Sequence, residues 1–135
     1  MRLRGTRTRS ALLVVDDEVE FHELIRAVFS ETHHVHGVTQ VEDAVRILRQ
    51  THIDVILLDV RLPRRPGWDL LRALSKNPQS PPVIVITADA RSQVRRDAEE
   101  LGAVYTVFKP IKPRQLRKMV EYCEELNQQK AHAIS

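Results

Sequence analysis

Five short apolar runs recur along the chain, separated by segments in which apolar residues are spaced differently. The runs cover residues 11–15, 35–38, 55–58, 83–86 and 104–108, and most are rich in β-branched side chains. Such runs are typical of strands. Between and after them, apolar residues recur every three or four positions, which predicts helices with one apolar face. The pattern predicts five strands alternating with five helices.

The predicted strands indicate how the sheet is covered. Residues 55–58 and 83–86 are apolar throughout, as expected of strands that are buried on both faces of a parallel sheet. Five right-handed strand-helix units in one small domain favour an α/β fold, a flavodoxin-like, doubly wound, five-stranded parallel sheet in the order 2-1-3-4-5 with five helices. In such sheets, ligands bind beyond the carboxyl ends of the strands, near the switch point between strands one and three.

Polar residues follow four of the five predicted strands. Asp16 and Asp17 end the first strand, Asp59 the third, Thr87 the fourth and Lys109 the fifth. Three neighbouring carboxylates raise one another's pKa unless a cation neutralises them, and oxygen ligands of this kind favour Mg²⁺. A lysine and a hydroxyl beside the ion suit the oxygens of a phosphoryl group, and an aspartate can serve as the nucleophile that forms an acyl phosphate.

These motifs, in this order, resemble the receiver domain of two-component response regulators over about residues 10–127. The motifs are Val-Val-Asp16-Asp17-Glu, Leu-Leu-Asp59-Val-Arg-Leu-Pro63, Gly67 before the third helix, Thr87-Ala88 and Lys109-Pro110. Each motif alone is a weak signal, whereas all of them in order at the expected strand ends are a strong one.

The resemblance implies that Asp59 accepts a phosphoryl group from a phosphohistidine on a sensor histidine kinase or a histidine phosphotransfer protein. Asp17, Asp59 and the backbone carbonyl of Arg61 would hold Mg²⁺, with Asp16 assisting. Thr87 and Lys109 would bind the phosphoryl oxygens, and the Lys109-Pro110 bond is expected to be cis. Phosphorylation would switch the surface of residues 91–126, formed by the fourth helix, fifth strand and fifth helix, for an unidentified protein partner.

Two departures from the family pattern modify these expectations. Thr106 stands three residues before Lys109, where the family has an aromatic switch residue, and Tyr105 is expected to face the other side of the strand. We expect a switch of smaller amplitude, gated by Thr87, with Ala88, Asp89 and Thr106 as modulating positions.

The second departure is a pair of opposite charges at the rim of the site. Arg61 and Asp89 stand at positions that tune dephosphorylation in the family. A salt bridge between them would crowd the attacking water, so we expect a long-lived phosphoryl-aspartate.

Charge and composition narrow the function classes. The chain has 135 residues and a formal net charge of +3, but four of its 21 basic residues are arginines within residues 1–10; the remaining 17 basic residues face 18 acidic ones, a net of −1. We expect residues 1–10 to be a flexible basic arm, 11–127 the receiver domain and 128–135 a C-terminal tail. The nearly neutral domain argues against nucleic-acid binding. Apolar runs of five residues or fewer argue against a membrane span, so we expect a cytoplasmic protein.

Several residues also have simpler interpretations. Asp16 and Asp17 alone would serve equally well as helix caps. His33, His34 and His36 resemble a metal cluster, but alternation splits them between the two faces of a strand, which favours a surface strand. We expect Cys123 to pack in the core and Trp68 to pack beneath the loop of the acidic site. We expect Arg91, Arg95 and Arg96 to form a solvated helix face, and a docking surface for an acidic partner is the alternative.

Two other functions remain open. The same residues would serve a small Mg²⁺-dependent phosphatase or phosphotransferase, although no general acid or base is evident near Asp59. A phosphorylation-independent interaction module is the third reading. The oligomeric state is expected to be a monomer or a phosphorylation-dependent homodimer.

Overall fold

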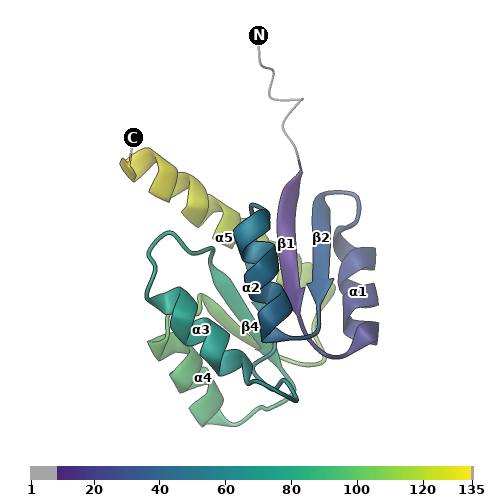
Figure 1. Cartoon of the computed structure of the whole chain (residues 1–135). Helices are drawn as coiled ribbons and strands as arrows, with labels where there is room; N and C mark the ends of the chain where they lie inside the picture. Colours follow the sequence, from purple (N-terminus) through teal and green to yellow (C-terminus); the bar gives the residue numbers. More distant parts are fainter. Residues whose placement is uncertain (1–8, 135) are drawn as a thin grey trace.

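The computed structural model describes residues 9–134, with side chains described through residue 130, and shows five strands alternating with five helices (Figure 1). All strand pairs are parallel and the order is β2-β1-β3-β4-β5, which confirms the predicted fold class. The elements are β1 Ser10–Val15, α1 Val19–Phe29, β2 His33–Val38, α2 Val41–Gln50, β3 Val55–Leu58, α3 Gly67–Ser75, β4 Val83–Thr87, α4 Ser92–Glu100, β5 Tyr105–Phe108 and α5 Pro113–Ile134. Residues 1–8 of the expected N-terminal arm lie outside the described residues.

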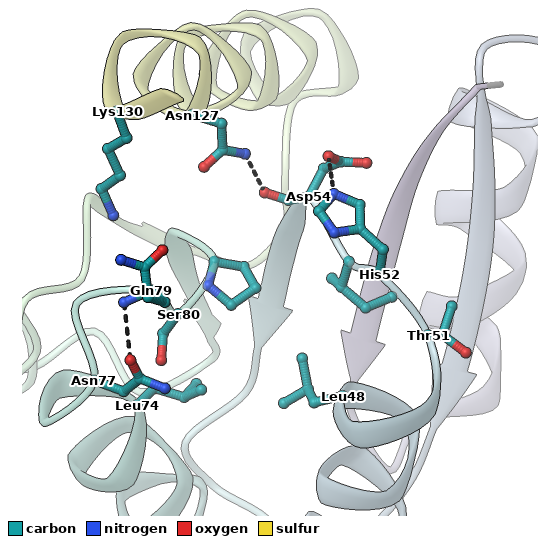
Figure 2. Close-up of a pocket in the computed structure, with 12 residues that line it drawn as sticks. Leu48, Thr51, His52, Asp54, Leu74, Asn77, Gln79, Ser80, Asn127 and Lys130 are labelled. Atoms are coloured by element: carbon teal, nitrogen blue, oxygen red, sulfur yellow. Dashed lines mark hydrogen bonds and ion pairs between the residues drawn. The ribbon is translucent and has the colours of Figure 1, made fainter. Parts of the chain in front are cut away.

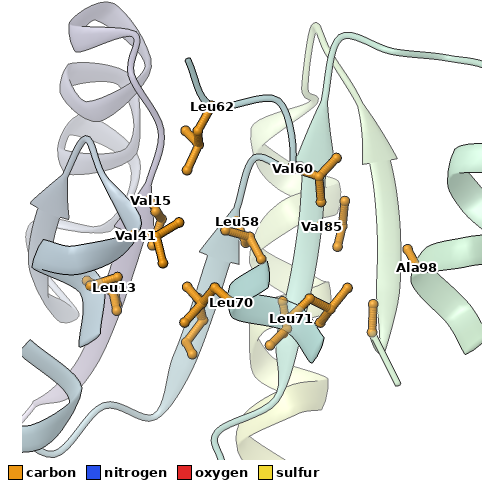
Figure 3. Packing of buried hydrophobic residues seen from close by; sticks show 14 of the residues in the cluster. Leu13, Val15, Val41, Leu58, Val60, Leu62, Leu70, Leu71, Val85 and Ala98 are labelled. Carbon is orange, nitrogen blue, oxygen red and sulfur yellow. The ribbon is translucent and has the colours of Figure 1, made fainter. Parts of the chain in front are cut away.

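Two apolar layers hold the helices against the sheet. Side chains of α2, α3 and α4 pack on one face, where Leu70 and Leu71 of α3 share one apolar cluster with Leu13 of β1 and Leu58 of β3 (Figure 3). Side chains of α1 and α5 pack on the other face in a second cluster. β3 and β4 are buried along their whole length, as their apolar runs predicted.

Cys123 of α5 belongs to the second cluster and is fully buried. Burial raises the pKa of its thiol to about 12, so the thiolate is disfavoured at neutral pH. The prediction that this cysteine is a core residue is confirmed.

Backbone hydrogen bonds continue the sheet by one residue beyond three strand ends. The amide of Asp16 donates to Val38 O at 3.1 Å, that of Asp59 to Val15 O at 2.9 Å, and that of Lys109 to Thr87 O at 2.9 Å. The sheet itself therefore fixes these three polar residues at one edge, the carboxyl edge of the strands.

The fifth helix continues to Ile134, past residue 127, where we placed the end of the domain. No glycine or proline follows Pro113, and the residues after Asn127 are mostly good helix formers. Two side chains of α5 contact loops at the amino edge of the sheet: Asn127 Nδ2 donates to Asp54 O at 2.8 Å, and Lys130 Nζ to Pro78 O at 3.3 Å. None of the helices among residues 9–134 is long and apolar enough to cross a membrane.

Candidate functional site

Three carboxylates meet at the carboxyl edge of the sheet. Asp16 and Asp17 follow β1 and Asp59 follows β3, and one oxygen of each lies within 4.8 Å of the others. Asp16 is 1% exposed and Asp59 6%, whereas Asp17 is open to solvent. Within the part of the chain that the structure describes, this is the one group of histidine, cysteine or acidic side chains arranged to hold a metal ion. The predicted convergence of the three residues is confirmed.

Burial and neighbouring groups act in opposite directions on the pKa of Asp59. Burial raises the pKa of its carboxyl, and so does the charge of Asp16. The amide of Arg61, which donates to Asp59 Oδ1 at 2.8 Å, and the ammonium of Lys109 lower it. The net result is a raised pKa, and burial is its largest cause.

Lys109 lies across the carboxylates. Its Nζ donates to Asp16 Oδ2 at 2.8 Å, to Glu18 Oε1, and more weakly to Asp59 Oδ2 at 3.5 Å. Burial alone lowers the pKa of this amine, but the hydrogen bonds and charges of Asp16, Glu18 and Asp59 outweigh burial and raise it. The ammonium also lies 4.7 Å from the centroid of the Phe21 ring. Lys109 is therefore charged and held at the site. The cis geometry expected for its bond to Pro110 is confirmed.

The end of β4 contributes Thr87, Ala88 and Asp89. Thr87 is fully buried, and its Oγ1 accepts a hydrogen bond from the Asp89 amide at 3.2 Å. Ala88 is exposed. The carboxylate of Asp89 forms the predicted salt bridge with Arg61, and it also pairs with Arg91, a contact that the sequence did not reveal. An arginine-aspartate-arginine bridge therefore joins the β3-α3 and β4-α4 loops at the rim of the site.

Thr106, opposite Val85 in the sheet, occupies the expected aromatic position and is 6% exposed. Its Oγ1 is buried and has no hydrogen-bond partner among the described residues. The neighbouring Tyr105 packs on the α1-α5 side, its ring centroid 6.0 Å from that of Tyr122. The expected opposite orientation of Tyr105 is confirmed.

Gly67 lets α3 begin directly against the end of β3. A Cβ at this position would lie 2.4 Å from Asp59 O and 2.8 Å from Val60 Cα. The Gly67 amide donates to Val60 O at 3.1 Å. Next to it, Trp68 is partly buried and packs against the apolar cluster beneath α2, α3 and α4, which confirms that it packs in the interior; its position beneath the site loop stays a prediction.

Other candidate positions have structural roles. His33 Nε2 lies 3.0 Å from Glu124 Oε2, and the His33 ring packs edge-on against Phe29. In β2, His34 is exposed, whereas His33 and His36 are partly buried. On α4, the Arg95 guanidinium lies 5.0 Å from the centroid of the Phe108 ring.

A separate hollow of about 480 Å³ lies at the opposite, amino edge of the sheet (Figure 2). It is bounded by the residues before β3, the α3-β4 loop and the end of α5, and includes the His52-Asp54 pair at 3.0 Å. None of the acidic, lysine or threonine residues predicted for the site borders it. This hollow and the acidic site are therefore at opposite ends of the domain.

Three contacts at the acidic site could not be foreseen from the sequence. Glu18, Phe21 and His22 of the loop before α1 and its first turns contact Lys109 or the Asp16 backbone. In the sequence, Phe21 fits the apolar face of α1, and nothing in the sequence indicates that it also contacts Lys109. His22 lies beside this apolar stripe, and nothing in its spacing marks a link to Asp16.

Comparisons with known proteins agree with this geometry. The response regulator receiver domain family matches residues 12–121. The cyclic di-GMP phosphodiesterase response regulator RpfG of Xanthomonas campestris is 29% identical over 123 residues, 87% of this chain and 32% of that protein. Response regulator SaeR of Staphylococcus aureus is 31% identical over 106 residues, 78% of this chain and 46% of that protein.

The chain thus spans less than half of either relative. Among solved structures, the receiver domain of the Francisella response regulator 1452 superposes with a TM-score of 0.81 at 22% identity, covering 88% of this chain and 99% of that one. This likeness shows the shared fold. On the match of residues 12–121 together with the carboxylate cluster at the predicted strand ends, the chain belongs to the response regulator receiver family.

Proposed function

We propose that Asp59 accepts a phosphoryl group from a phosphohistidine on a sensor histidine kinase or a histidine phosphotransfer protein. The observation that carries the proposal is the placement of a nearly buried carboxylate, Asp59, beside Asp16 and within 3.5 Å of the Lys109 ammonium. A carboxylate oxygen of Asp59 attacks phosphorus, the P–N bond to the donor imidazole breaks, and the imidazole leaves with the bonding pair and takes up a proton. The product is an acyl phosphate.

The carboxylates also fit a hard divalent cation. Asp17 and Asp59, with the backbone carbonyl of Arg61, would hold Mg²⁺, and Asp16 would assist. When bound, the ion supplies charge neutralisation for the phosphoryl oxygens. Burial, and to a lesser degree the charge of Asp16, raises the pKa of Asp59 and so disfavours its ionised form, and a bound cation would offset this cost.

Lys109 and Thr87 are the proposed ligands of the phosphoryl oxygens. Lys109 already bridges Asp16 and Asp59, and a new dianionic group on Asp59 attracts the ammonium away from Asp16. The Thr87 hydroxyl can turn to donate to the phosphoryl group while the Asp89 amide hydrogen bond adjusts. Positioning and charge then supply the transfer step without a separate base.

The output of the phosphorylated state is the surface of α4, β5 and α5, residues 91–126. Movement of Thr87, next to the exposed Ala88, would reposition the loop into α4. Since Thr106 replaces an aromatic switch side chain, we expect a smaller rearrangement than such a ring would give. We expect a protein partner in the cytoplasm to bind this surface, and nucleic acid not to be a direct ligand. The form of this chain that binds the partner would be a monomer or a homodimer that forms on phosphorylation.

The bridge of Asp89 with Arg61 and Arg91 supports a slow loss of the phosphoryl group. Both arginine side chains are exposed, so the ion pairs add little to stability. We nevertheless expect their side chains to crowd the water that must approach Asp59 to hydrolyse the acyl phosphate. We therefore expect a long-lived phosphoryl-aspartate.

Incubation with acetyl phosphate and Mg²⁺, followed by intact-mass measurement, tests the proposal. The wild-type chain is expected to gain one phosphoryl group, and the Asp59→Asn variant none. Omission of Mg²⁺ is expected to suppress the modification. Continuous release of phosphate from small phosphoesters, without a stable adduct, would point instead to a phosphatase.

A further inference from the structure

We infer that His22 is a positioning residue for the proposed metal site, because its imidazole fixes the peptide group that joins Asp16 to Asp17. The inference rests on the proposed Mg²⁺ site and extends it to a residue outside the acidic cluster. His22 lies on α1, is 5% exposed, and its Nε2 lies 2.6 Å from Asp16 O. A carbonyl oxygen only accepts, so Nε2 carries the proton and donates it.

The Asp16 carbonyl needs such a donor. β1 ends at Val15, and Asp16 itself is 1% exposed, so a carbonyl here would otherwise be buried without a partner. His22 supplies that partner from the first turn of α1. The contact spans six residues and closes the β1-α1 loop onto its own helix.

Asp16 is held through every polar group it has. Its amide donates to Val38 O, Oδ1 accepts from the Glu18 amide at 2.8 Å, and Oδ2 accepts from Lys109 Nζ. The His22 contact is the one that orients the following peptide. Because the peptide group is planar, the direction of the Asp16 carbonyl also sets the direction in which the chain enters Asp17. Asp17 is exposed and has no comparable packing of its own.

Gly37 of β2 provides the space for the imidazole. A Cβ at this position would lie 2.3 Å from His22 Nδ1 and 3.0 Å from His22 Cε1. Gly37 is not in the left-handed region of backbone conformation, so its missing side chain matters for space and not for conformational freedom. The absence of a side chain at Gly37 therefore leaves the space in which the His22 imidazole reaches the Asp16 carbonyl.

Mg²⁺ titrations followed by amide NMR shifts test the inference. His22→Leu removes the donor from a buried position and is expected to raise the Mg²⁺ Kd about fivefold, the effect of losing one hydrogen bond of ordinary strength. His22→Gln keeps an N–H donor on a side chain of similar reach and is expected to stay within about twofold of wild type. Ile25→Val, a buried change on the same helix, is the control for lost stability and is expected to leave the Kd unchanged.

A second variant guards against poor folding of His22→Leu. Gly37→Ala keeps the histidine but displaces its ring, and it is expected to weaken Mg²⁺ binding in the same direction. In the wild-type chain, the imidazole nitrogen shifts are expected to show the Nε2–H tautomer. An Nδ1–H tautomer, or unchanged Mg²⁺ affinity in both variants, would overturn the inference while leaving the proposed function intact. Absence of Mg²⁺ binding by the wild-type chain would overturn both.

Discussion

Replacing Thr106 by valine is expected to stabilise this domain, although it removes a polar group from a buried strand. Thr106 is 6% exposed in the centre of β5, and its Oγ1 has no hydrogen-bond partner among the described residues. Valine is also β-branched and has nearly the same shape, so the backbone and the packing against neighbours are retained. The change exchanges an unpaired hydroxyl for a methyl group.

The magnitude follows from the cost of an unsatisfied buried group. Leaving a neutral donor or acceptor without a partner costs about 1–3 kcal/mol, and the new methyl group adds apolar burial. The denatured chain differs little between threonine and valine. We therefore expect Thr106→Val to raise the free energy of unfolding by about 1 kcal/mol, which corresponds to roughly 4 °C in Tm for a domain of this size.

Urea unfolding followed by circular dichroism measures the effect. The midpoint is expected to rise while the slope m stays constant, since the exposed surface on unfolding is unchanged. Thr87→Val is the matched control: the same exchange in the neighbouring strand leaves the Asp89 amide without its acceptor, and we expect a loss of about 1 kcal/mol. If Thr106→Val lowers the midpoint as Thr87→Val does, the Thr106 hydroxyl has a stabilising partner and the reasoning is wrong.

Three further predictions concern the acidic site. Burial raises the pKa of Asp59 in the folded state, so the stability that its protonated form contributes is present below the unfolded-state pKa near 3.8 and lost as the pH rises through the folded-state pKa. Without Mg²⁺, Asp59→Asn is therefore expected to be more stable than wild type at pH 7, with the difference closing below about pH 3.8; a less stable variant at pH 7 would contradict this. Gly67→Ala places a Cβ 2.4 Å from Asp59 O and 2.8 Å from Val60 Cα, both backbone atoms, and is expected to cost about 2 kcal/mol in urea unfolding and to slow phosphorylation; a normal rate and midpoint would refute the close approach. Arg61→Asn breaks one half of the bridge to Asp89 and is expected to speed loss of the phosphoryl group several-fold by time-resolved intact mass, and an unchanged rate would rule out the gating role.

The fold and the acidic cluster were predictable because both depend on short-range patterns. Apolar runs marked the strands, the parallel topology brought the strand ends together, and Asp16, Asp17 and Asp59 therefore had to meet. The Arg61-Asp89 bridge was also foreseen, because each residue stands at a fixed offset from a strand end.

Contacts that depend on side-chain packing could not be predicted in this way. The contact of His22 with the Asp16 carbonyl requires the crossing of α1 over β2, and the role of Gly37 appears only when the distance to the ring is known. Arg91 was predicted to lie on a solvated helix face, but it precedes α4 and pairs with Asp89. Helix periodicity does not describe the conformation of a residue before the helix, so this contact could not be predicted. The extent of α5 to Ile134 could not be predicted, because neither glycine nor proline marks the end of the helix.

The central claim, that Asp59 is the phosphoacceptor of this receiver domain, is tested most directly by locating the modified residue. The chain is treated with acetyl phosphate and Mg²⁺ and then reduced with borohydride, which converts a phosphorylated aspartate to homoserine, and its peptides are sequenced by mass spectrometry. We expect homoserine at position 59 alone, and none when phosphate replaces acetyl phosphate. Homoserine at Asp16 or Asp17 with an intact Asp59, or no reduced aspartate in a folded chain that binds Mg²⁺, would contradict the central claim.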